Sequence, residues 1–383
     1  HSLTGIVGLT PDPDTLFEVS YDRSRGWAKY AHGMMDGSQF DRDSYAVKFE
    51  RAHLSPIVEK LTLNFNHDTI DHIMDNYSLR PAGMRAMGTD VRREQYGIRA
   101  VTDLRFSPQT SAAVGIDLRR DAHYFAEAHK HLKGTPNNDM DIDSFGIFLE
   151  YSRDLTERSR LLTGLRYDRM ETDYHNARFR NGMGRTVRNL VPGNAHDHAV
   201  SGFVRWENTA KQQPLTFYVG LGHAERPADY WEAYHTWAAY SNRVNGQTAS
   251  PSTTRPAKEK NTQLDLGWVY TGEKTNASLS LYYANVNDFI LRKPQIGMGP
   301  TARTPYANVD ARLYGFEAEV TRTVSPLWTL GASLAYTRGD DRTNDAPLPQ
   351  IAPLEANLTA KYSHKKAEAN AVWRLVSKQN RYH

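Results

Sequence analysis

Apolar and polar side chains alternate with a period of two residues along many stretches of this chain, and few fold classes accept such a pattern. Along Trp328–Thr337, every second residue is apolar or aromatic, and the residues between them are small or polar. Such alternation puts the two kinds of side chain on opposite faces of a β-strand. The pattern recurs at residues 44–50, 61–66, 114–119, 263–270 and 314–321. The sequence therefore predicts an all-β protein whose sheet has one apolar face and one polar face.

Short and long connections alternate between the predicted strands. The short ones carry turn-forming residues, as in Thr10–Thr15, Ser107–Thr110 and Thr271–Asn276. The long ones are polar and lie near residues 30–42, 75–91, 126–141, 173–197, 224–260, 291–306 and 338–355. Eight short turns and seven long loops separate sixteen predicted strands. Most of these strands have about 10–16 residues, whereas strands of soluble proteins average about 5–6.

Long strands with short turns at one end and long loops at the other are typical of an antiparallel transmembrane β-barrel of the outer membrane. In hydrocarbon, every backbone N–H and C=O needs a partner in the ladder, and a closed barrel provides one. Aromatic residues at the predicted strand ends fit the rows that mark membrane interfaces, with ordinary cross-strand packing as the alternative. These residues are Tyr21, Trp27, Tyr30, Tyr151, Tyr167, Tyr174, Trp268, Tyr270, Trp328 and Tyr336.

Composition and periodicity exclude several other classes. No stretch approaches the roughly 20 apolar residues of a membrane-spanning helix. The 47 basic and 44 acidic residues nearly balance, so nothing favours a nucleic-acid partner. Cysteine is absent, which excludes disulfides and thiolate metal sites within this chain. A propeller or solenoid would show a repeat of fixed period, and a sandwich would not need strands of this length.

Catalytic signatures are missing from the sequence. It contains no nucleotide-binding glycine loop, no G-x-S-x-G nucleophile motif and no H-E-x-x-H zinc motif. Asp71 and His72 are adjacent in a predicted strand, so their side chains point to opposite faces and cannot act together on one substrate. We therefore predict that the protein is not an enzyme.

Several segments resemble the TonB-dependent outer-membrane receptors. In the order of that family, they are Arg255–Asn261, Tyr282–Ile290, Tyr306–Asp310, Gly315–Glu319 and Pro347–Pro353. A narrower resemblance, to the copper-receptor branch of the family, is carried by Gly33–Phe40, Asp71–Arg80 and Ala371–Arg381. Together these segments extend the resemblance over essentially the whole of residues 1–383.

The resemblance implies a 22-stranded barrel occluded by an N-terminal plug domain. Residues 1–383 would then be one barrel domain, incomplete at both ends, with about 16 of the 22 strands and without the plug. The implied location is the outer membrane of a Gram-negative bacterium, among outer-membrane lipid and lipopolysaccharide. Uptake would be energised by the TonB complex through the plug. In the copper receptors a Cys and a Met of the plug complete the metal site, and this chain contains neither of them.

His72 and Met74 form the candidate metal site. If the strand over residues 57–72 keeps its register, both fall on the lumen-facing side with Asn64 and Asn66. Residues i and i+2 on one face lie about 7 Å apart at their Cα atoms, so an imidazole and a thioether can reach one ion. This soft donor pair favours copper, Cu(I) especially, over Mg²⁺ or Ca²⁺. A β-bulge would break the register, and the alternative is a solvated histidine beside a packing methionine.

Further methionines and histidines lie in the neighbouring loops. Met34 and Met35 precede the candidate pair, and Met84 and Met87 follow it; they are either secondary thioether contacts for copper or loop-packing residues. Two histidine groups could hold Zn²⁺ or be ordinary loop residues. They are His123, His129 and His131, and the pair His196 and His198. The aromatic loop at 224–260 either binds a ligand or packs on its neighbours.

Together these features predict a TonB-dependent receptor that binds and imports copper, with copper as the transported ligand. One alternative is a receptor of the same family for a siderophore or for cobalamin. A second alternative, from another class, is a passive porin-like channel or a surface adhesin. A plug carrying a Cys/Met pair upstream of this chain would favour copper over both alternatives.

Overall fold

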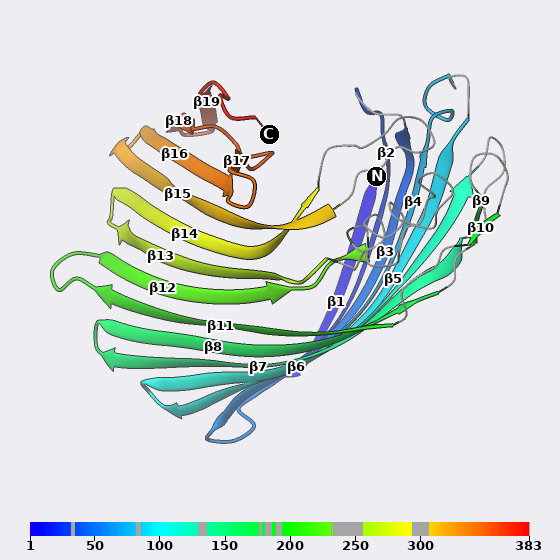
Figure 1. Ribbon diagram of the computed structural model, residues 1–383. Helices are drawn as coiled ribbons and strands as arrows, with labels where there is room; N and C mark the ends of the chain where they lie inside the picture. The colour runs from blue at the N-terminus through cyan, green and yellow to red at the C-terminus, as the bar shows by residue number, and fades with distance from the viewer. Residues whose placement is uncertain are drawn as a thin grey trace.

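The stretches of alternating side chains form strands, as the sequence predicts (Figure 1). The computed structural model describes residues 1–31, 35–81, 86–128, 136–175, 178–180, 186–188, 194–230, 232, 256–292 and 306–382. Sixteen of its strands have ten residues or more. They are β1 (Ser2–Asp12), β2 (Thr15–Ala28), β3 (Asp36–Ala52), β4 (Val58–Asp75), β5 (Gly88–Ser107), β6 (Thr110–Ala128), β7 (Asn137–Thr156), β8 (Ser159–Tyr174), β11 (Ala195–Thr209), β12 (Leu215–Arg226), β13 (Glu259–Thr271), β14 (Thr275–Arg292), β15 (Tyr306–Ser325), β16 (Trp328–Asp341), β18 (Glu355–His364) and β19 (Ala367–Val376). Three short strands complete the set: β9 (Arg178–Arg180), β10 (Thr186–Arg188) and β17 (Ala346–Pro347).

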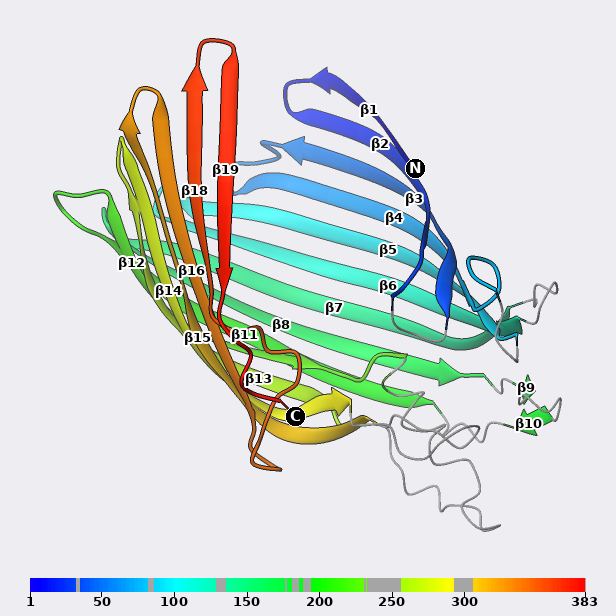
Figure 2. The same ribbon diagram turned by 90° about the horizontal axis from the view of Figure 1, so that it is seen from above.

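The long strands form a single antiparallel meander. Each pairs with the next long strand along the chain, so that β8 is followed in the sheet by β11, and β16 by β18. β17 pairs with the end of β16, and β9 pairs with β10 as a separate hairpin. β1 pairs along its length with β2, and β19 with β18, and these two strands border the open side of the curved sheet in Figure 2. In the described part of the chain, no helix has the length and hydropathy needed to cross a membrane.

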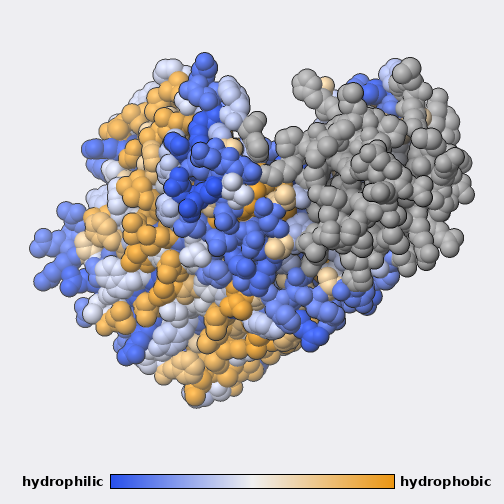
Figure 3. Space-filling model, in the orientation of Figure 1, coloured by the Kyte–Doolittle hydropathy of each residue, from blue (hydrophilic) through white to orange (hydrophobic). Residues whose placement is uncertain are grey.

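Apolar side chains lie in rows across the outer face of the sheet. One row joins Phe65, Ile98, Leu118 and Phe145, which the register of β4 to β7 places side by side. These side chains are 40% to 49% exposed. Figure 3 shows such apolar areas gathered on the outer wall of the sheet. A continuous apolar surface of this kind requires apolar surroundings, which the acyl chains of a bilayer provide.

A row of stacked rings crosses the outer face near the end of the sheet that carries the long loops. Tyr21, Tyr45, His67 and Tyr96 are cross-strand neighbours on β2 to β5. Their ring centroids are 4.9, 6.2 and 4.3 Å apart in that order. On the opposite wall, Tyr283 and Tyr314 form a matching pair at 6.3 Å. Such rows mark the boundary between hydrocarbon and headgroups. We call the six rings on the two walls together the outer aromatic row.

The inner face is polar and rich in ion pairs. Arg166 lies between Asp117 and Asp168, at 2.5 and 2.6 Å, and Lys48 pairs with Glu50 at 3.1 Å. These residues occupy the alternate positions of strands whose other face carries apolar side chains. An aqueous interior satisfies such a face, so the two faces agree with the predicted transmembrane barrel.

The strands are longer, and the loops shorter, than alternation alone predicts. The expected loop at 30–42 gives way to β3 from Asp36, and the expected loop at 75–91 to β5 from Gly88. Beyond the outer aromatic row both faces of the strands meet water, so side chains there are polar on both sides and the period of two disappears. Backbone pairing nevertheless continues, which extends the ladder past the apolar band.

Candidate metal site at the loop end of β4

The pairing of β4 with β5 continues without interruption from Lys60 to Asp75. His72 lies opposite Val91, and Met74 lies opposite Thr89. Because side chains alternate along an unbroken strand, His72 and Met74 share the inner face with Asn66. The prediction that both donors face the lumen therefore agrees with the register of the strand.

A β-bulge does occur nearby, but in the neighbouring strand. On β3, Gly37 pairs with Met74 and Phe40 with His72, and the register shifts between Gly37 and Gln39. The extra residue is Ser38, whose hydroxyl donates a hydrogen bond to Asp75 at 2.6 Å. The bulge brings Gly37 and Phe40 to the same face, opposite the two donors of β4.

Phe40 holds the imidazole of His72 from one side. The two rings are stacked with centroids 4.5 Å apart and planes inclined by 26°. Gly37 lies beneath the Phe40 ring so closely that a Cβ added there would overlap it. The Nε2 atom of His72 is buried and finds no hydrogen-bond partner among the residues that the structure describes. This nitrogen therefore has a lone pair or a proton to offer to a further group.

Met87 lies directly before β5 and is tied to the end of β4 by two hydrogen bonds. Its N–H donates to the side-chain oxygen of Asn76 at 2.9 Å, and its C=O accepts from the N–H of Asn76 at 3.2 Å. This pair continues the alignment of β4 with β5, in which Met74 faces Thr89. Asn76 and Met87 thus lie directly beyond the paired ends of β4 and β5, next to the row of Met74 and Thr89.

The described residues include only part of the remaining predicted thioether ligands. Met35 directly precedes β3, whose first residue, Asp36, pairs with Asp75. By the same register, Met35 falls opposite Asn76, in the row of Met87. Met34 and Met84 lie outside the described residues. The structure therefore brings His72 and Met74 to neighbouring rows of β4, and Met87 and Met35 directly precede β5 and β3.

A buried ion pair on the reverse side fixes the two loops that carry these methionines. Asp36 is fully buried and accepts two hydrogen bonds from Arg80, one of them from Nε at 2.6 Å. Asp36 also accepts from the N–H of Tyr30 at 2.9 Å, and Arg80 donates to the C=O of Tyr30. These residues lie past the outer aromatic row, outside the membrane-spanning part of the strands. The Arg80 guanidinium lowers the pKa of the Asp36 carboxyl to about 2, so Asp36 is ionised.

Asp75 organises the start of the second loop. Its carboxylate accepts hydrogen bonds from the hydroxyls of Ser38 and Ser78, both at 2.6 Å. It also accepts from the N–H groups of Tyr77 and Ser78. Asp75 is 2% exposed, and its acceptor capacity is used by the loop and the bulge. The sequence resemblance covers Asp36, Asp75 and Arg80, but the residues alone gave no signal of these contacts.

The other candidate histidines have different surroundings. His123 is buried, stacks on Tyr230 and forms a hydrogen bond with Asp139 at 2.6 Å, while His129 and His131 lie outside the described residues. His196 and His198 face outward, where His198 contacts the hydroxyl of Tyr167 at 2.6 Å.

Most of the aromatic loop at 224–260 lies outside the described residues, including Trp231, Tyr234, His235, Trp237 and Tyr240. In the described part of the chain, no group of three or more His, Asp or Glu side chains is arranged to hold a metal ion.

The whole sheet matches a known architecture. Residues 3–383 match the family model described as TonB-dependent receptor-like β-barrel. The chain is a TonB-dependent receptor barrel. Members of this family are transporters. The family also implies an outer-membrane location for this receptor barrel.

Solved structures show the same fold. The copper transporter OprC is 34% identical to this receptor barrel, with a TM-score of 0.89, over 100% of this chain and 61% of that one. The ferric-catecholate import receptor Fiu of E. coli K12 is 11% identical, with a TM-score of 0.70, over 98% and 63% of the two chains. The hemophore receptor HasR of Serratia marcescens is 14% identical, with a TM-score of 0.71, over 99% and 64%.

The lower identities show the fold alone. The receptor barrel described here spans about three fifths of the length of the copper transporter that it resembles. A comparison with curated proteins finds no match.

Proposed function

We propose that this chain is the barrel part of an outer-membrane receptor that binds copper and admits it in a TonB-dependent manner. The observation that carries the proposal is the unbroken register of β4, which puts His72 and Met74 on one inner face. The 34% identity to a copper transporter supports the same assignment. Copper is the substrate here, and the TonB complex is the proposed source of energy.

His72 and Met74 are the proposed barrel ligands. An imidazole nitrogen and a thioether form a soft set that selects copper, and Cu(I) in particular, over hard cations. The buried Nε2 of His72 has no hydrogen-bond partner among the described residues, and Phe40 stacks on the face of the ring. Two donors do not saturate a Cu(I) ion, so further soft ligands from outside β4 complete the site. Met87 and Met35 are the proposed secondary contacts, and Met34 and Met84 belong to the same two loops.

Substitutions that keep shape but remove donors test the ligand assignment. In the full-length receptor, His72→Phe keeps an aromatic ring against Phe40 but has no nitrogen, and Met74→Leu keeps the bulk but has no sulfur. We expect either change to lower bound copper to a small fraction of the wild-type occupancy. The measurement is anomalous diffraction at the copper edge, together with competition against a chromogenic Cu(I) chelator.

His67→Phe is the matched control. His67 lies on the same strand, five residues before His72, but points outward and stacks between Tyr45 and Tyr96. This variant should bind copper like the wild type. Undiminished copper in both His72→Phe and Met74→Leu would reject the proposed ligands. A receptor that takes up an iron chelate or cobalamin, and no copper, would reject the proposed substrate.

A further inference from the structure

A cluster of arginines lies on the outer face of β15 and β16, next to the outer aromatic row. Arg312 and Arg338 occupy alternate positions of strands whose other outward residues are Tyr314 and Tyr336. Tyr314 pairs with Arg338, and Arg312 pairs with Asp340 one row nearer the loops. The Arg312 guanidinium lies 5.7 Å from the centre of the Tyr314 ring. The cluster is therefore at the depth where lipid headgroups meet the aromatic row.

Three guanidinium groups converge on one carboxylate in this cluster. Asp340 contacts Arg312 at 3.1 Å, Arg338 at 3.5 Å and Arg381 at 2.5 Å. Three positive charges thus face one negative charge, which leaves a local excess of two positive charges. We call Arg312, Arg338 and Arg381 the arginine cluster. Asp340 is 14% exposed at its side chain, whereas the three arginines are 35% to 41% exposed.

The cluster lines a polar cavity. The cavity has a volume of about 300 Å³, and Arg342, Asp341 and Asp345 also line it. The Asp341 carboxylate is turned into its own loop, where it accepts from the N–H groups of Thr343 and Asn344 at 3.0 Å. The Nε atoms of Arg312 and Arg338 are buried, and Nε of Arg338 lies 3.5 Å from the Asp340 carboxylate. Four arginines and three aspartates line the cavity, so its net charge remains positive.

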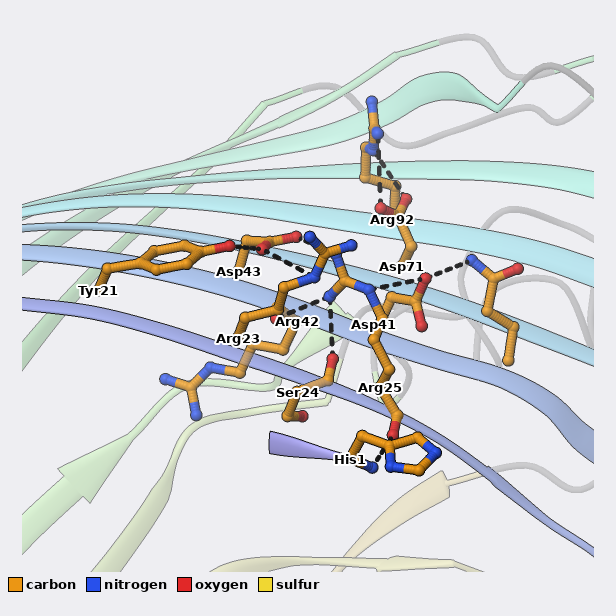
Figure 4. A network of polar contacts seen from close by, with 11 residues as sticks. His1, Tyr21, Arg23, Ser24, Arg25, Asp41, Arg42, Asp43, Asp71 and Arg92 are labelled. Carbon is orange, nitrogen blue, oxygen red and sulfur yellow. Dashed lines mark hydrogen bonds and ion pairs between the residues drawn. The ribbon is translucent and has the colours of Figure 1, made fainter. Parts of the chain in front are cut away.

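The opposite wall has charged residues at the same level but no such excess. There, Arg25 pairs with Asp41 at 3.3 Å and with Asp43 at 2.5 Å, and Arg92 pairs with Asp71 at 2.8 Å (Figure 4). The hydroxyl of Tyr21 also donates to Asp43, which ties this network to the outer aromatic row. With Arg23 and Glu94, three arginines face four carboxylates across β2 to β5. In this network the acids outnumber the arginines, whereas in the arginine cluster the arginines outnumber the acids.

We infer that the arginine cluster binds a phosphate group of a membrane lipid headgroup, of the kind carried by the lipid A moiety of lipopolysaccharide. Arginine forks match phosphate oxygens with paired hydrogen bonds, and a phosphomonoester carries close to two negative charges. The apolar outer face below the cluster, with Leu334 and Phe316 on the same strands, faces the acyl chains. Phosphate and acyl chains would thus meet matching surfaces one above the other. The bound lipid would anchor β15 and β16 at a fixed depth.

Native mass spectrometry of the full-length receptor with lipid A tests this site. We expect diphosphorylated lipid A to be retained on the wild type. The Arg312→Gln and Arg338→Gln variants should each weaken retention by at least about tenfold, as expected for loss of one charge-assisted hydrogen bond. Arg312→Lys, which keeps the charge but loses the fork, should give an intermediate loss. Heat modifiability on gels checks that each variant is folded.

Four comparisons test the inference. Arg25→Gln, on the balanced network, is the matched control and should retain lipid A as the wild type does. Equal retention of dephosphorylated lipid A would show that the acyl chains alone bind. Displacement of lipid A by millimolar inorganic phosphate would assign the site to free phosphate instead. Wild-type retention by folded Arg312→Gln and Arg338→Gln would place the lipid elsewhere.

Discussion

Phe40 and Gly37 position the His72 imidazole, although neither offers a metal donor. The Phe40 ring fills the space directly above Gly37 and stacks on His72 at 4.5 Å. A side chain at residue 37 would push that ring away from its place. The glycine is therefore required for the close approach of a neighbouring ring, and not for an unusual backbone angle.

Substitution at Gly37 should weaken copper binding only while Phe40 is present. Gly37→Ala places a Cβ inside the Phe40 ring and displaces the ring toward His72, so we expect copper affinity to fall several-fold. Phe40→Ala alone should have a smaller effect, because the inner-face orientation of His72 is set by the strand. Chelator competition on the two single variants and the double variant measures their coupling. Additive losses would show that Gly37 acts by some route other than Phe40.

The ends of β3, β4 and β5 form a two-sided element. On the inner side lie His72 and Met74, and on the reverse side the carboxylates of Asp36 and Asp75 hold the loops. The loops bring methionines to the site, so their anchors position donors without touching the metal. This division explains why a short segment of sequence contains both soft donors and buried acids.

Removing one partner of the Asp36–Arg80 pair should have unequal effects. Asp36 is fully buried, whereas the Arg80 side chain is 27% exposed. Arg80→Gln leaves a buried carboxylate without its cation, while Asp36→Asn leaves a cation that water can reach. We therefore expect Arg80→Gln to speed proteolytic cleavage within residues 76–87 more than Asp36→Asn does. Equal cleavage of both variants and the wild type would show that the pair does not hold the loop.

Sequence alone could predict the strands and the phase of the donors, but not their supports. The phase of His72 and Met74 followed from alternation at Leu61–Asn66, because β4 has no bulge between these residues. The bulge at Ser38 lies in a polar stretch where alternation has already ended, so no local pattern marks it. The Asp36–Arg80 contact joins residues 44 positions apart, and pattern reasoning does not pair such distant polar residues.

The whole molecule has two faces with different solvents, and substitutions should separate them. On β14, Leu281 points outward and lies between the row that contains Trp268 and the row that contains Tyr283. Ser278 points inward on the same strand. Arg in place of Leu281 should destabilise the receptor by about 2–4 kcal/mol near the bilayer midplane, and Ser278→Arg by much less. Urea unfolding in lipid bilayers measures the difference. Similar losses at both positions would contradict the assignment of the faces.

The antiparallel meander has a consequence for how the barrel wall assembles. In the described sheet, every long strand hydrogen-bonds to strands that are its neighbours along the polypeptide. Each hairpin can therefore pair with the preceding hairpin without a long crossover connection, so that little loop entropy is lost at each step. The newly made chain can insert into the membrane as successive paired β-hairpins. Only closure of the barrel would require pairing between strands that are distant in the sequence.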